Sequence, residues 1–115
     1  WGAATRLWLP FPPEPAARSV EALRADDASI LHLYRRLLAA RRASPALRLG
    51  GSTWLDAPAG VLAWERVHEP SGDRRVVAVN LTGEEVASPP GAVEVASAAG
   101  VAAGRLGPWQ AAVLR

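Results

Sequence analysis

Three amino-acid types are missing from this 115-residue chain: cysteine, lysine and methionine. Without cysteine the chain has no disulfides and no thiolate metal site, which fits a reducing compartment. Without lysine all 13 basic residues are arginine, yet the net charge is only +2. That charge gives no reason to expect a nucleic acid or a membrane as partner.

The absence of methionine bears on completeness. Translation starts at methionine, and the enzyme that removes it requires a small second residue, which Trp1 is not. We therefore expect a piece of a longer product. No apolar run approaches the length of a membrane span, and no signal peptide is visible. Together with the missing cysteines, this predicts a cytoplasmic protein.

Apolar residues make up half of the chain and charged residues 21%, as in ordinary globular domains. The length suits one small domain with a modest core. The first segment, Trp1–Pro15, carries four prolines among its last six residues. Proline lacks an amide donor and restricts its neighbour, so this segment is expected to be a rigid, extended loop. A short helical turn capped by Ser19 is expected to follow it.

The clearest helix is predicted between Asp26 and Ser44, with Asp26 or Asp27 as its cap. It should end at Ser44, because Pro45 restricts its predecessor. Arg41 lies close to the centre of the apolar side, where it should meet the last helix carbonyls or a carboxylate of the layer that the helix packs against. The apolar stripe consists of Ile30, Leu31, Leu33, Tyr34, Leu37 and Leu38.

After Leu47 the pattern changes to a period of two with turn formers between short runs. "VLAWERV", "EPSGD" and "RRVVAVNL" form the clearest hairpin, and the apolar "VVAVNL" belongs in a sheet interior. Short antiparallel strands of this kind predict a small β-sandwich. The predicted strands are Leu49–Leu55, Val61–His68, Arg74–Leu81, Glu85–Ala87, Val93–Ala96 and Trp109–Leu114.

This β module has limited room for so broad a helix stripe, so we expect the helix to pack on a preceding domain.

Chemical motifs are scarce. His32 and His68 have no second ligand nearby and are interpreted as surface histidines. The carboxylates fall at caps and turns rather than in a catalytic pair, and no nucleophile elbow, phosphate loop or dinucleotide motif is present. "NLT" at Asn80–Thr82 fits a glycosylation acceptor formally, but we interpret it as chance. We therefore predict a segment with no catalytic residues, no metal site and no cofactor.

The tryptophans could form a sugar-stacking platform. Trp54, Trp64 and Trp109 lie within predicted strands, where burial in the core is commoner. Trp8, in the proline-rich loop, is the one kept as a possible sugar contact; under the family resemblance described next, it would be a possible contact to substrate at the rim of the active site.

Several stretches of the chain resemble one known family. They are "LWLPFPPEPAARSV", "ADDASILHLYRRLLAARRASPAL", "GVLAWER", "VVAVNL" and "LGPWQAAVLR". They are similar to the C-terminal end of α-glucosidases of glycoside hydrolase family 13, in the oligo-glucosidase and trehalose-synthase-like branch of the α-amylase superfamily.

The resemblance implies a (β/α)₈ barrel followed by an antiparallel β-sandwich. Residues 1–45 would end the barrel, with a rim loop over 1–25 and the last helix over 26–44, and residues 46–115 would form the β domain. The resemblance also implies retaining hydrolysis of α-glucosidic bonds in short oligosaccharides by an Asp nucleophile, a Glu acid/base and a second Asp. All three would lie upstream of Trp1. The missing barrel would be the packing partner of the helix and would bind the α-linked gluco-oligosaccharide.

Two alternatives stay open at this point. A transglucosylating or isomerising relative, such as a trehalose synthase, would share this segment. A free-standing carbohydrate-binding or interaction module would instead need an exposed row of aromatic side chains.

Overall fold

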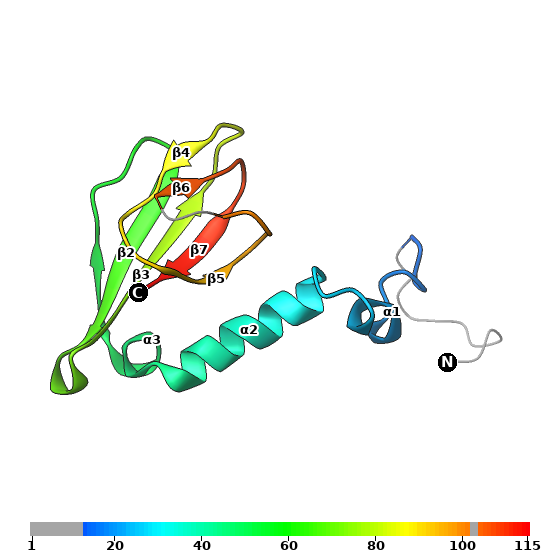
Figure 1. Cartoon of the computed structure of the whole chain (residues 1–115), viewed down its shortest axis with the longest axis horizontal. Helices are drawn as coiled ribbons and strands as arrows, with labels where there is room; N and C mark the ends of the chain where they lie inside the picture. Colours follow the sequence, from blue (N-terminus) through cyan, green and yellow to red (C-terminus); the bar gives the residue numbers. More distant parts are fainter. Residues whose placement is uncertain (1–12, 102–103) are drawn as a thin grey trace, which may run out of the picture.

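The computed structural model describes residues 13–101 and 104–115 and places helices first and strands after them (Figure 1). The helices are α1 (Val20–Arg24), α2 (Ile30–Ala43) and α3 (Pro45–Leu49), and a 3₁₀ turn spans Glu69–Ser71. The strands are β1 (Gly51–Trp54), β2 (Val61–His68), β3 (Asp73–Asn80), β4 (Val86–Ala87), β5 (Val93–Ala96), β6 (Arg105–Leu106) and β7 (Ala111–Leu114).

The start of α2 differs from the prediction. Ser19 caps α1 as expected, its hydroxyl accepting from the Ala22 amide at 3.2 Å. The cap residue of α2 is Ser29 rather than Asp26 or Asp27. The Asp26 carboxylate accepts from the Ala28 amide instead and closes a turn before the helix. The Ser29 hydroxyl donates to the Leu23 carbonyl at 2.7 Å and so ties α2 to α1.

The helix ends as predicted, but a second, short helix follows it where loop and strand were expected. Ser44 is the cap of α3, with Pro45 at its first position, where a missing amide donor costs nothing. Gly50 then ends α3 with an extended backbone, and an added Cβ there would lie 2.6 Å from the Ala46 carbonyl oxygen. The predicted strand from Leu49 therefore begins only at Gly51.

The predicted hairpin is confirmed. Strands β2 and β3 pair antiparallel from Val61 opposite Asn80 to His68 opposite Asp73. Gly72 closes the connection with a φ of 66°, a left-handed conformation that glycine adopts without strain. The sheet order is β1-β2-β3-β7-β5, so the apolar strand β3 lies in the interior as expected. The bounds predicted for Val61–His68 and Val93–Ala96 are those of β2 and β5.

One face of this five-stranded sheet is covered by a two-stranded sheet of β4 and β6. Strand β6 was missed, because it is only two residues long and lies in a glycine-punctuated stretch. Its Leu106 is fully buried against the sheet. The core between the two layers consists of Ala63, Ala78, Leu106, Ala112 and Leu114. The predicted antiparallel β domain is therefore confirmed.

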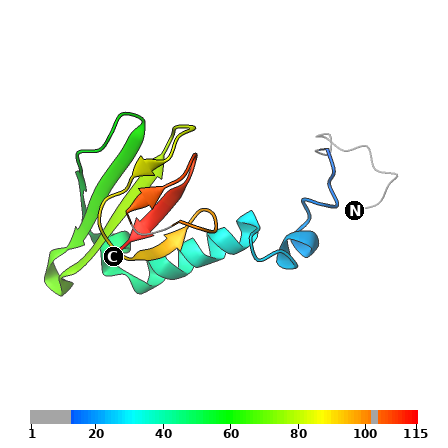
Figure 2. The same ribbon diagram turned by 45° about the horizontal axis from the view of Figure 1, so that its top comes forward.

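Helix α2 packs against the other face of the sheet. Ala40 forms a cluster with Val95 and Val113, and Leu33 and Val77 pack against it. Figures 1 and 2 both show α2 running alongside β5. The β module thus buries one side of the helix, which the sequence analysis did not expect. Whether α2 is also the last helix of a barrel stays a prediction, as do the domain bounds 1–45 and 46–115.

Candidate functional site

Helix α2 carries a second apolar side that the sheet does not reach. Ile30, Tyr34 and Leu38 recur at every fourth position and so lie on one face of the helix. Their exposed fractions are 56%, 61% and 48%. We call these three residues the α2 row. A row of large exposed apolar side chains is typical of an interaction surface.

A groove connects the α2 row to the sheet. Its volume is about 270 Å³, and Leu33 and Leu37 of α2 form one wall while Val77, Ala111 and Val113 of the sheet contribute to the other. Leu37 lies between Leu33 and the α2 row around the helix, so the apolar surface continues from the sheet over the helix.

The C-terminal end of this surface is basic. Arg41, Arg42 and Arg48 line a hollow of about 330 Å³ together with Leu38 and Leu49. Among the ion pairs and side-chain hydrogen bonds of residues 13–101 and 104–115, none involves these three guanidinium groups. The prediction that Arg41 meets the last carbonyls of its helix therefore finds no contact in the described structure.

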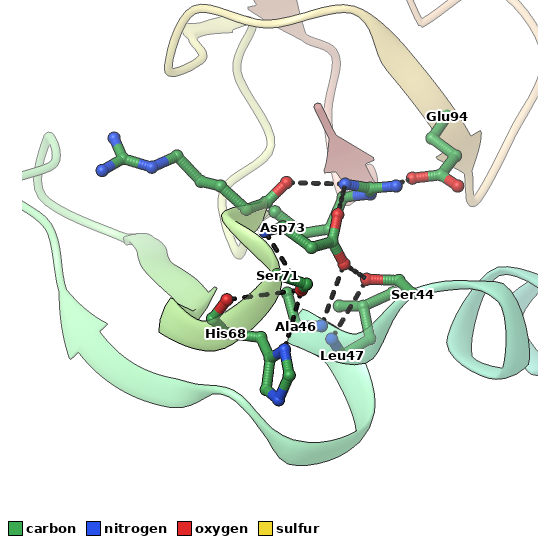
Figure 3. A network of polar contacts seen from close by, with 9 residues as sticks. Ser44, Ala46, Leu47, His68, Ser71, Asp73 and Glu94 are labelled. Atoms are coloured by element: carbon green, nitrogen blue, oxygen red, sulfur yellow. Dashed lines mark hydrogen bonds and ion pairs between the residues drawn. The ribbon is translucent and has the colours of Figure 1, made fainter.

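A polar network fixes the junction of α2 and α3 on the sheet (Figure 3). The Asp73 carboxylate, at the start of β3, accepts from the Ser44 hydroxyl at 2.5 Å and from the Ala46 amide at 2.9 Å. Ser44 also accepts from the Leu47 amide and is fully buried. A carboxylate at the first amides of α3 thus holds the end of α2 in place.

Arg75 extends this network to β5. Its guanidinium bridges Asp73 and Glu94, each at 2.5 Å. The Ser44 hydroxyl, the Ala46 amide and the Arg75 charge together hold the pKa of Asp73 below its ordinary value. The network therefore depends on an ionised carboxylate.

The tryptophans depart from the prediction. Trp54 and Trp109 are exposed, at 70% and 69%, rather than buried. Trp54 lies on the edge strand β1, where no further strand covers it, and Trp109 lies in a turn with a φ of 57°. Trp64 is half-buried and meets Trp54 edge to face, with ring centroids 5.6 Å apart. Trp8 lies outside the described residues.

Both histidines and several acidic side chains have structural partners. The His68 ring bonds to the Ser71 hydroxyl at 2.7 Å within its turn, and the half-buried His32 ring bonds to the Arg24 carbonyl at 3.2 Å. In the part of the chain that the structure describes, no group of three metal-ligating side chains occurs. Glu65, Glu85 and Glu94 each pair with an arginine. None of the helices described there is long and apolar enough to cross a membrane.

The formal glycosylation acceptor is engaged inside the fold. Asn80 is buried, and its amide nitrogen donates to the Glu84 and Gly107 carbonyls at 2.7 and 2.8 Å. Its oxygen accepts from the Thr82 amide and hydroxyl. Attachment of a sugar would break these bonds, which supports the interpretation of this motif as chance.

No family model matches the chain. It is 35% identical over 81 residues to a probable alpha-glucosidase of Rhizobium meliloti (strain 1021), covering 70% of this chain and 14% of that protein. The structure resembles the trehalulose synthase MutB of Pseudomonas mesoacidophila MX-45, with a TM-score of 0.79, 27% identity, and coverage of 93% of this chain and 21% of that one. A mutant of MutB in complex with the substrate sucrose matches with the same values.

These matches in sequence and in fold agree with the resemblance seen in the helix and strand motifs. The chain is thus similar to an α-glucosidase-like C-terminal segment of glycoside hydrolase family 13. It spans about one seventh of the length of its curated relative and about one fifth of MutB. The segment consists of an antiparallel β domain and the helices that precede it.

Proposed function

We propose that this chain is the C-terminal portion of a retaining α-glucosidase that cleaves α-glucosidic bonds of short oligosaccharides. The segment itself is structural and holds none of the catalytic residues. The preceding (β/α)₈ barrel would bind the substrate and carry out hydrolysis in the cytoplasm. The similarity to an α-glucosidase and to a sucrose-binding relative supports this substrate class.

The exposed α2 row carries the structural part of the proposal. A helix with one apolar side against the sheet and another facing out is suited to stand between two layers. We propose that α2 is the last helix of the barrel and that its row packs on the barrel strands. The segment would then stabilise the barrel by covering its apolar surface.

The first test is the intact mass of the gene product in its source cells. We expect a polypeptide several times the 12.1 kDa of this chain, with activity on maltose or isomaltose that the isolated segment lacks. A native product of about that small mass, or hydrolysis by the purified segment, would contradict the proposal.

A close alternative is an enzyme that transfers glucose or isomerises its substrate. It is favoured by the similarity to a trehalulose synthase. Product analysis of the longer polypeptide with sucrose and with maltose separates the two: glucose release indicates hydrolysis, whereas isomeric disaccharides indicate transfer.

A second candidate function, a carbohydrate-binding module, is favoured by the exposed rings of Trp54 and Trp109. Malto-oligosaccharide added to the isolated segment would then change tryptophan fluorescence, and Trp54→Ala would abolish the change. No response up to millimolar sugar would eliminate this candidate.

A further inference from the structure

The α2 row continues into a charged position. Arg41 follows Leu38 by three residues and Leu37 by four, so it lies next along the same side of the helix. It is exposed in this structure. A layer that covers Tyr34 and Leu38 must therefore also cover the stem of Arg41 and approach its guanidinium group.

A guanidinium that loses its water needs a partner of opposite charge. Removing one member of a buried ion pair strongly lowers stability, because the other charge is left uncompensated. Arg41 takes part in none of the ion pairs of the described residues. Two acids of the neighbouring strands, Asp73 and Glu65, are already bound to Arg75 and Arg74.

The hollow around Arg41 points to the same chemistry. Arg42 and Arg48 also line it, and the apolar side chains of Leu38 and Leu49 complete it. Three guanidinium groups at an apolar rim attract a carboxylate, whose planar oxygens fit the paired donors of arginine.

We propose that the barrel preceding this chain places a carboxylate side chain in this hollow, as an ion-pair partner of Arg41. This inference rests on the proposed function, since it takes the barrel to be the layer on the α2 row. The occupant follows from charge complementarity and from relatives that are about four to five times the length of this chain. The pair would fix the register of α2 between the sheet and the barrel.

The test uses the longer polypeptide and compares Arg41→Met with Arg35→Met. Arg35 is an exposed arginine of the same helix on its polar side, so it serves as the matched control. We expect Arg41→Met to raise the equilibrium constant of unfolding by roughly 100-fold or more at pH 7, measured by urea unfolding. Arg35→Met should change it less than about 3-fold.

The pH dependence identifies the partner as a carboxylate. In Arg41→Met the unpaired barrel carboxylate would have a raised pKa, so protonation at acid pH relieves the loss. The difference between the wild type and the variant should therefore shrink as the pH falls through the carboxylate range. Arg41→Lys, which keeps a positive charge, should recover much of the loss and shows that the site tolerates substitution.

Leu38→Asp separates this inference from the proposed function. If Leu38→Asp destabilises the longer polypeptide while Arg41→Met matches Arg35→Met, the row is covered and the carboxylate is absent. A loss in Arg41→Met that does not vary with pH overturns the carboxylate in the same way. If neither Leu38→Asp nor Arg41→Met changes the stability of the longer polypeptide, the barrel does not cover the row and both proposals fail. Dissociation of a dimer by Arg41→Met would assign the hollow to a second copy and overturn the inference.

Discussion

The two faces of the five-stranded sheet differ in how far this chain can cover them. On one face, Leu106 of β6 and Leu114 of β7 are almost completely buried in a core that the chain closes by itself. On the other face α2 buries Ala40 but leaves Tyr34 and Leu38 exposed, and Trp54 lies open on the edge strand. The first face therefore holds a core that residues of this chain close by themselves. The second face is left open by the described residues, and under our proposal the preceding barrel covers it.

The largest effect should come from the closed face. Leu106→Ala removes a fully buried side chain and leaves a cavity, so it should lower the free energy of unfolding of the isolated segment by about 2–5 kcal/mol. Leu38→Ala removes the same atoms from the open face and should change it by less than about 0.5 kcal/mol. Urea unfolding of the two variants measures the difference. Equal losses of unfolding free energy in the two variants would mean that the isolated segment already buries both faces of the sheet.

The network between the faces should give an intermediate effect. Asp73→Ala leaves the buried Ser44 hydroxyl and the Ala46 amide without their acceptor, which should cost about 1–3 kcal/mol. The exposed Asp56 in the loop between β1 and β2 offers a control, Asp56→Ala, that should be nearly neutral. Urea unfolding at pH 7 compares them. If the two variants lose the same amount, the network does not hold α2 and α3 on the sheet.

The same carboxylate sets a pH dependence. Its folded-state pKa is lowered, so its contribution is complete above the ordinary aspartate pKa and is lost as the pH falls through the folded-state value. The wild type should therefore lose stability toward acid pH more steeply than Asp73→Ala does. Parallel curves for the two proteins would contradict the ionised network.

Prediction from sequence succeeded where the signal is local and repeated. The alternation in Val61–His68 and the proline after Ser44 gave the correct ends of β2 and α2. Prediction failed where a tertiary contact decides which secondary structure forms. Ser44 looked like the end of one helix, but its hydroxyl also caps a second, because Asp73 stands 29 residues away in sequence and bonds to it. Strand β6 is too short to carry a period.

The candidate surface was predicted in part. The helical period identified the apolar side of α2 and the anomalous position of Arg41, both of which are properties of one helix. It could not divide that side between the sheet and the solvent, since the division depends on where β5 and β7 lie. Nor could it place Trp54 on an edge strand, because the order of strands in a sheet is not encoded in their alternation.

The smallest change in stability, and the sharpest view of the open face, should come from the α2 row. Tyr34→Ser with Leu38→Ser adds polar groups where the isolated segment contacts only water, so its free energy of unfolding should change by less than about 1 kcal/mol. Self-association of the segment should fall, because exposed apolar patches promote aggregation. Light scattering across a concentration series measures this, with Arg35→Ser with Ala39→Ser on the polar side as the control. If the tendency to associate is unchanged, the α2 row does not cause it, and the surface of the sheet around Trp54 would be the next one to test.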